Sequence, residues 1–254
     1  MTFIVGIKCT NGLVLATDSL ETDGIKRRFR RKIEFTRGTG WEMGWGAASN
    51  NADIIDRFSQ ELRDNLRSVP FDIHKIQDAT ESALLLIQRK YKKRMDVVFG
   101  LIGSGVLKNG EPVVPDIRLY RATSESCCLS PEKQYCCAGM DDSLAEMILD
   151  NTFYQFIQAS EAIRLVVFLT NVMKEYADGV GKNTHVFFAT HASGKWTPLL
   201  DRQVRGIERT FKLAAFQSLI SRYWNEKQSK YSKEWMDEQT DAQMQRAKQL
   251  TSQK

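Results

Sequence analysis

Apolar residues along the first 200 positions follow two periods, and the switch between them divides the chain into expected strands and helices. The chain opens with apolar runs at 3–9 and 13–17, separated by Asn11-Gly12, which is typical of a β-hairpin turn. Further strand-like segments lie at 32–36, 42–46, 97–103, 116–121, 126–129, 135–138, 184–190 and 196–200. Apolar positions at the helical period lie at 54–62, 72–92, 142–154, 160–176 and 205–224.

Helices that come in consecutive pairs argue against a doubly wound parallel fold, in which single helices alternate with strands. They favour an α+β fold in which antiparallel sheets are covered by helical layers. The first helix follows Asn50 or Asn51, either of which can cap it. After Asp201 the chain becomes rich in Lys, Glu, Gln and Ser. We therefore expect one domain over 1–204 and a C-terminal helical extension over 205–254, either solvated or in contact with a partner.

Composition and charge narrow the class of protein. With 254 residues, 42% hydrophobic residues and a net charge of +5, the chain is expected to be an ordered globular protein. No apolar run reaches the roughly 18 residues that span a bilayer, and the N-terminus lacks a secretory signal pattern. Of five cysteines, four form the adjacent pairs 127–128 and 136–137, which is poor spacing for disulfides. We expect a soluble cytoplasmic protein with reduced thiols.

Three features suggest other functions, and none of them is favoured. Six of the seven residues at 26–32 are cationic, and such runs can bind nucleic-acid phosphates, but a solvated loop, a subunit contact or a substrate-pocket contribution fits as well. Each Cys pair lies in an expected strand, where neighbours point to opposite faces, so a pair can offer only one sulfur to a metal ion. The three histidines are far apart, without a Ser or carboxylate at triad-like offsets. We expect no metal and no cofactor.

Thr2 carries the most specific chemistry, because removal of Met1 gives it a free α-amine beside its hydroxyl. Methionine aminopeptidases remove the initiator when the next residue is small. An α-amine has an ordinary pKa of about 7.7 to 8.0, so near neutral pH it can accept the hydroxyl proton during attack. The β-branch of threonine helps to hold the hydroxyl in one geometry. One residue can then supply both the nucleophile and the base of an amide hydrolase.

Three further residues can complete this chemistry. A cation beside the α-amine disfavours its protonation, and Lys32, at the start of an expected strand, is a candidate. A buried ammonium needs a carboxylate, and Asp18 ends the second strand of the opening hairpin, which returns beside residue 2. Gly46, in a Gly-flanked turn expected at 44–47, can offer a backbone N–H to the tetrahedral intermediate.

Five segments match one known family: TFIVGIK at 2–8, GLVLATDS at 12–19, ETDG at 21–24, RKI at 31–33 and GWGAA at 44–48. Through these segments the sequence resembles the proteasome β-type subunits and their bacterial relatives, within the N-terminal nucleophile hydrolases. The interval from Thr2 to Asp18 is 18 − 2 = 16, and that from Lys32 to Gly46 is 46 − 32 = 14, as in that family. The resemblance reaches to about residue 200 and implies a four-layer αββα sandwich of two antiparallel sheets between helical layers.

The resemblance implies a role for each matched residue. Thr2 is the nucleophile, Lys32 shapes the pKa of its amine, Asp18 orients Lys32, and Gly46 donates to the oxyanion. It also implies a threonine peptidase that degrades proteins or peptides as a ring-like homo-oligomer, with an ATP-dependent unfoldase as a further partner. No membrane is involved, and nucleic acid is an unlikely partner.

Other positions depart from the family or match it less closely. Arg30 and Gly44 are expected in the substrate pocket, where Arg30 favours acidic or polar side chains. Met140 replaces the usual Ser, and Asp178 is followed by Gly where a Ser is usual shortly after an Asp. Asp141 and Asp178 are candidates for the supporting role. These departures keep open an inactive homologue that serves as an assembly or binding module, and a small-amide acylase of the same superfamily is a further alternative.

Overall fold

A computed structural model describes residues 2–23, 26–29, 32–49, 51–103, 116–132, 134–139, 142–177 and 180–211, with the backbone alone for 21–23 and 26–29. The chain divides into a compact unit, Met1–Glu208, and a second unit, Arg209–Lys254. The architecture below is that of the first unit. The expected extension over 205–254 lies mostly outside the described residues, so the division between 1–204 and 205–254 stays a prediction.

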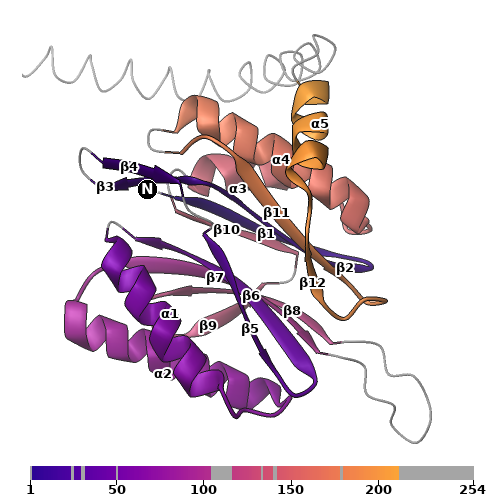
Figure 1. The fold of residues 1–254 in the computed structure, drawn as a ribbon. Helices are drawn as coiled ribbons and strands as arrows, with labels where there is room; N and C mark the ends of the chain where they lie inside the picture. The colour runs from indigo at the N-terminus through magenta and orange to yellow at the C-terminus, as the bar shows by residue number, and fades with distance from the viewer. Residues whose placement is uncertain are drawn as a thin grey trace, which may run out of the picture. The chain divides into compact units, whose positions relative to one another are not determined.

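Two five-stranded antiparallel sheets lie face to face (Figure 1). The first sheet has the order β10 (Tyr135–Gly139), β1 (Phe3–Cys9), β2 (Gly12–Asp18), β11 (Thr184–Thr190) and β12 (Trp196–Pro198). The second has the order β5 (Ile33–Gly38), β6 (Trp41–Ser49), β7 (Met95–Gly103), β8 (Ile117–Thr123) and β9 (Leu129–Glu132). A separate hairpin of β3 (Leu20–Asp23) and β4 (Lys26–Phe29) follows β2 closely.

Helices cover the outer faces of both sheets (Figure 1). The second sheet is covered by α1 (Ala52–Leu66) and α2 (Ile73–Tyr91). The first is covered by α3 (Asp142–Thr152) and α4 (Ala159–Tyr176), and α5 (Asp201–Phe211) follows β12. The predicted α+β sandwich of two antiparallel sheets between helical layers is confirmed. None of the helices in the described residues has the length and apolarity to cross a membrane.

Short polar side chains start the first two helices. The Asn51 side chain accepts a hydrogen bond from the Asp53 backbone N–H at 2.9 Å, so Asn51 is the N-cap of α1. The Asp72 side chain accepts from the backbone N–H groups of His74 and Lys75 at the start of α2. The sequence left Asn50 and Asn51 open for the first cap, and the structure selects Asn51.

Alternate residues of β6 face opposite sides of the second sheet: one side packs against the helices and the other against the first sheet. The Trp45 ring points toward the helices, where it packs edge-on against Phe58 with ring centroids 5.2 Å apart. Gly44 and Gly46 face the other sheet, and a Cβ on Gly46 would lie 3.1 Å from Ile4 Cδ1. Small residues on this face let the sheets approach, which brings β6 against β1. The expected turn at 44–47 is therefore wrong: close approach, not a turn, explains these glycines.

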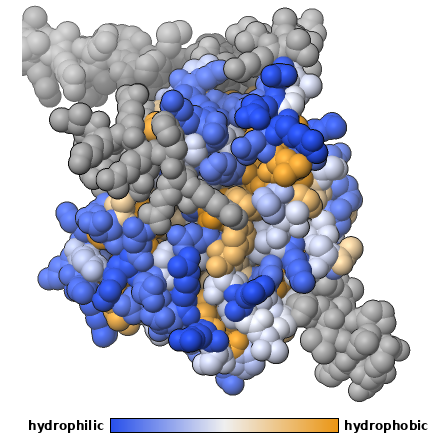
Figure 2. Space-filling model, in the orientation of Figure 1, coloured by the Kyte–Doolittle hydropathy of each residue, from blue (hydrophilic) through white to orange (hydrophobic). Residues whose placement is uncertain are grey.

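Hydrophobic side chains are visible in a band over β6 and β12 (Figure 2). The Trp196 ring lies 5.9 Å from the Phe35 ring, and the Trp196 backbone N–H donates to Glu42 of β6 at 3.0 Å. Strand β12 therefore joins the first sheet to the second along this side of the sandwich.

Two local expectations are corrected. The expected strand at 126–129 begins too early, because Thr123 Oγ1 accepts from the Ser126 backbone N–H and helps close a turn before β9. The first four residues of the cationic run, 26–29, form β4, which pairs with β3 from Leu20↔Phe29 to Asp23↔Lys26. The alternation of apolar and polar residues that predicts a half-buried strand is missing there, so this hairpin was not predicted.

Candidate active site

A buried ion pair joins the two sheets at the end of β2. Asp18 is the last residue of β2 and its side chain is fully buried, whereas Lys32 directly precedes β5 and its side chain is 7% exposed. Lys32 Nζ lies 2.9 Å from Asp18 Oδ1 and 3.0 Å from Oδ2. It also donates to the Leu20 carbonyl oxygen. Because a buried charge without a partner is costly, the pair fixes both side chains in one arrangement.

Three backbone N–H groups complete the environment of the Asp18 carboxylate. Phe3 donates to Oδ1 at 3.0 Å, and Leu20 and Gly181 donate to Oδ2 at 3.0 and 3.1 Å. These donors come from β1, from the first residue of β3, and from the segment before β11. The carboxylate is thus oriented by parts of the chain that are far apart in sequence.

Thr2 lies directly beside this pair because it precedes Phe3, whose N–H contacts Asp18. The β1–β2 register pairs Ile4 with Thr17, and Thr17 Oγ1 donates to the Phe3 carbonyl oxygen at 2.8 Å. Thr2 itself is buried, with 6% of its surface exposed. The structure therefore brings the beginning of the chain, the carboxylate and the ammonium to one end of β1 and β2.

The end of β10 closes against the other side of Thr2. Gly139 pairs with Phe3 and has a φ of +111°, and a Cβ at this position would lie 1.9 Å from the Thr2 carbonyl oxygen. Only glycine fits this close approach and this backbone conformation. Helix α3 begins at Asp142. Met140 and Asp141, which connect Gly139 to this helix, lie outside the described residues.

The predicted glycines occupy different places. Gly46 lies against Ile4, two residues after Thr2, and its role as an oxyanion donor stays a prediction. Gly44 lies between the sheets, where a Cβ would meet Phe35, Trp196 and Leu15 at 2.9 to 3.2 Å. Its pocket role stays a prediction. Three other predicted positions lie outside the described residues: Arg30, Asp141 and Asp178.

One edge of β6 extends beyond its neighbour next to the site. Pairing with β5 begins at Ile33↔Gly46, whereas residues 47–49 of β6 pair with β7 alone. Among the described strands, none pairs with the other edge of 47–49. Backbone N–H and C=O groups on such an edge can pair with an added extended chain.

A second charged cluster ties α3 to the other sheet. Arg121 of β8 donates to Asp142 at 2.7 Å and to Glu146 at 2.8 Å, both on α3. Nearby, burial raises the pKa of Asp96, although Arg94 pairs with its carboxylate at 3.3 Å. Arg121 therefore anchors the first turn of α3 to β8.

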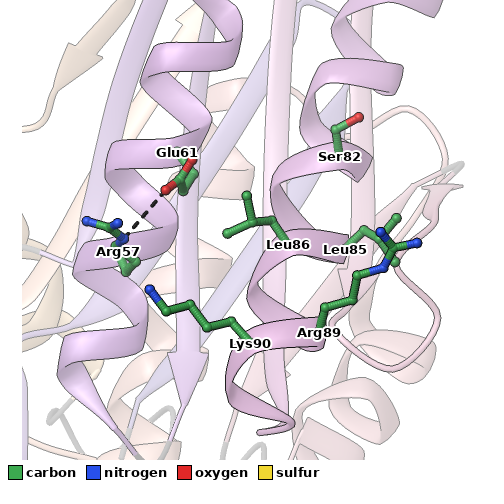
Figure 3. Close-up of a pocket in the computed structure, with 7 residues that line it drawn as sticks. All are labelled: Arg57, Glu61, Ser82, Leu85, Leu86, Arg89 and Lys90. Carbon is green, nitrogen blue, oxygen red and sulfur yellow. Dashed lines mark ion pairs between the residues drawn. The ribbon is translucent and has the colours of Figure 1, made fainter.

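A groove on the outer side of the second sheet is lined by residues of α1 and α2 (Figure 3). It is lined by Arg57 and Glu61 of α1, which pair at 3.5 Å, and by Ser82, Leu85, Leu86, Arg89 and Lys90 of α2. These helices cover the second sheet, whereas Asp18 belongs to the first. Ser82 offers the one hydroxyl in this lining, without a histidine to activate it.

Some contacts at the site were missed from the sequence. The Gly181 N–H bonds to Asp18, and the Leu20 carbonyl oxygen accepts from Lys32. Because almost every residue type has these backbone groups, the sequence does not reveal such contacts. A glycine shortly before the strand at 184–190 was the only available signal for the first of them. Within the described residues, no group of three or more His, Cys, Asp or Glu is placed to hold a metal ion.

The sandwich with this ion pair at the start of its first strand defines an α+β fold of the proteasome type. The family model described as Proteasome subunit matches residues 2–187. The chain therefore belongs to the proteasome subunit family. A search of curated proteins gave no match.

Solved structures of proteins called Anbu share the fold. The Anbu (Gly-1) mutant from Hyphomicrobium sp. strain MC1 has a TM-score of 0.71 and 15% identity, covering 86% of this chain and 96% of that one. Anbu, described as an ancestral beta-subunit, from Yersinia bercovieri has a TM-score of 0.69 and 12% identity, covering 87% and 96%. A helical assembly of the Anbu complex from Pseudomonas aeruginosa has a TM-score of 0.67 and 14% identity, with the same coverage.

Proposed function

We propose that this protein is a threonine-type peptidase whose nucleophile is Thr2 after removal of Met1. The Thr2 hydroxyl attacks the carbonyl carbon of a peptide bond while the α-amine accepts its proton. The amine then protonates the leaving nitrogen, and an ester forms between Thr2 and the acyl part. Water, activated by the same amine, hydrolyses the ester and restores the hydroxyl.

One observation carries this proposal: the buried Asp18–Lys32 pair lies where the Phe3 N–H meets the same carboxylate. A lysine held charged beside Thr2 disfavours protonation of the α-amine and keeps it available as a base. Asp18 neutralises the ammonium in the folded protein and orients it. Gly46, which lies against Ile4, supplies an N–H to the oxyanion in this proposal.

Among the described strands, none pairs with the β5-side edge of 47–49, and we propose an extended polypeptide as the substrate that pairs there. Backbone groups of 47–49 can pair with a substrate strand and hold its scissile carbonyl near Thr2. In this proposal Arg30 and Gly44 contribute to the substrate pocket, and Asp141 or Asp178 supports the proton transfer. The five cysteines are unpaired in the structure, which fits a reducing compartment such as the cytoplasm.

Self-assembly is a further part of the proposal. Membership of the proteasome subunit family and likeness to a helical assembly of the Anbu complex both support a homo-oligomer. We propose that copies of this chain assemble with their sites sheltered, either in a closed ring or in an open helical array, and that an ATP-dependent unfoldase delivers substrates.

A non-catalytic assembly or binding module is the second candidate. Met140 stands where the family usually has a Ser, and Gly179 follows Asp178 in the other supporting segment. Loss of supporting hydroxyls would leave the architecture intact while lowering or abolishing hydrolysis.

Intact mass and active-site labelling of the full chain test the two candidates. We expect loss of Met1 and one covalent adduct with a peptide epoxyketone, which requires both the hydroxyl and the amine of Thr2. Thr2→Ala should abolish the adduct and Thr2→Ser should retain it. Lys32→Ala should slow labelling by about 100-fold, whereas the matched surface variant Lys75→Ala should label like the wild type.

Two results would contradict the peptidase. Retention of Met1 without an adduct favours the module, and an adduct that persists in Thr2→Ala assigns the reaction to another residue. Circular dichroism of each variant separates loss of reactivity from loss of fold.

A further inference from the structure

We infer that Glu208 of α5 is a positioning residue for the Asp18 carboxylate, acting through Lys174 and Thr184. The consequence for reactivity rests on the proposed function, whereas the structural coupling does not. Among the hydrogen bonds of the described residues, none joins these three side chains to Asp18, so the effect passes through residues 181–184 and the β2–β11 register.

The three side chains form a closed cluster. Lys174 Nζ donates to Glu208 Oε1 at 3.0 Å and to Thr184 Oγ1 at 2.6 Å, and Thr184 Oγ1 donates to the same Glu208 oxygen at 2.9 Å. Lys174 and Glu208 are only 14% and 20% exposed, and Thr184 is buried. Low exposure strengthens such a charged network relative to an ion pair in solvent.

The cluster holds both ends of one connection. Lys174 lies in the last turn of α4 and Thr184 is the first residue of β11. The hydrogen bonds of the cluster therefore link the end of α4 to the start of β11. Glu208 bridges those ends from α5, which stands beside α4 (Figure 1).

The last residues before β11 form part of the active-site environment. Gly181 donates its N–H to Asp18 Oδ2 at 3.1 Å, and the Asn183 N–H donates to Ser19 Oγ at 3.0 Å. Thr184 is also directly opposite Asp18 in the β2–β11 register. The cluster is therefore one residue away from one of these contacts and in register with the carboxylate itself.

Release of the cluster should loosen the Gly181 contact. A neutral side chain in place of the Glu208 carboxylate leaves Lys174 without its charged partner and gives Thr184 a weaker acceptor, so Thr184 and the residues just before it are less restrained. Asp18 then keeps Lys32 but is oriented by fewer fixed donors. Misplacement of a group that orients catalytic residues lowers the rate of chemistry more than substrate affinity.

Hydrogen exchange of the full chain tests the coupling without any activity. The variants are Glu208→Gln, which keeps the size of the side chain, and Thr184→Val, which removes only the hydroxyl. Glu175→Gln is the matched control, because Glu175 is exposed on α4 next to Lys174. We expect exchange at Gly181 to rise about tenfold in the two cluster variants and to be unchanged in the control.

Epoxyketone labelling then tests the consequence. We expect the maximal inactivation rate to fall about tenfold in both cluster variants, with the half-saturating probe concentration unchanged. Unchanged exchange at Gly181 in both variants overturns the coupling. Faster exchange with unchanged labelling overturns the positioning role. A wild-type protein that does not label contradicts the peptidase, while the exchange measurement still decides the coupling.

Discussion

Single residues at this site differ in how much change they tolerate. Asp18 balances one ammonium and accepts three backbone N–H groups, so a neutral or shorter side chain leaves several buried donors unsatisfied. Gly139 has no hydrogen-bonding side chain, yet its position is equally restricted by the Thr2 carbonyl. The restriction at Gly139 is steric and the one at Asp18 is electrostatic.

Gly139→Ala should destabilise the fold strongly. Its φ of +111° strains any side chain, and the added Cβ would lie 1.9 Å from the Thr2 carbonyl oxygen, so β10 and β1 would have to separate. We expect a loss of about 3 kcal/mol or more in the free energy of unfolding, measured by urea denaturation.

Gly194→Ala is the control for backbone strain alone. Gly194 has a φ of +57°, but no atom lies within 4 Å of a Cβ built there. Its substitution should cost only about 1 kcal/mol. Equal losses of unfolding free energy in the two variants would show that the close contact with Thr2 does not contribute to the effect of Gly139→Ala.

At the scale of elements, β10 is enclosed on both faces. Cys136 points into the core between the sheets, whereas Cys137 lies on the opposite face, and both are buried. Burial raises the pKa of both thiols well above the ordinary range, and it raises that of Cys9 on β1 to about 12. Cys128, outside these strands, is exposed.

Alkylation with iodoacetamide at pH 8 should therefore distinguish these cysteines. The thiolate is the reactive form, and a raised pKa lowers its fraction at this pH, so Cys9, Cys136 and Cys137 should remain unmodified while Cys128 reacts. In denaturant their pKa values return toward the ordinary value, and all five should react. Peptide mass spectrometry reads out each site, and native labelling of Cys136 at the rate of Cys128 would contradict the enclosed strand.

Elements with a clear period were predictable from the sequence, and those shaped by distant contacts were not. The opening hairpin and the helix at 72–92 follow from local alternation and turn chemistry. The glycines at 44 and 46 were assigned to a turn because their reason, the approach of β1, involves the other sheet. The β3–β4 hairpin has no apolar alternation to reveal it.

At the scale of the whole molecule, the site contains some residues that the sequence predicts and some contacts that it does not. Residue types and a family resemblance in the intervals predict Thr2, Asp18 and Lys32 as site residues, and the structure brings Asp18 and Lys32 together beside Phe3. Gly181 contributes only a backbone N–H, and the cluster around Glu208 joins three elements that are not adjacent in sequence. Such contributions depend on tertiary packing and carry no local pattern.

The proposed self-assembly predicts a species much larger than the 29.0 kDa chain in sedimentation velocity of the full protein. A closed ring has a fixed number of subunits, so its sedimentation coefficient should level off as concentration rises. An open helical array should continue to grow. A single species of monomer mass across the micromolar range would contradict assembly.

The groups that donate hydrogen bonds to the Asp18 carboxylate are synthesised at different times during translation. A ribosome that has released residues 2–32 has already supplied the threonine, the acid and the lysine, but the amide of residue 181 is still to be translated. In the proposed peptidase, an unfinished polypeptide thus carries the nucleophile and the ion pair without all the contacts that orient them. Under the same proposal, we expect that Thr2 of a nascent chain does not react with peptides until most of the sequence has been translated.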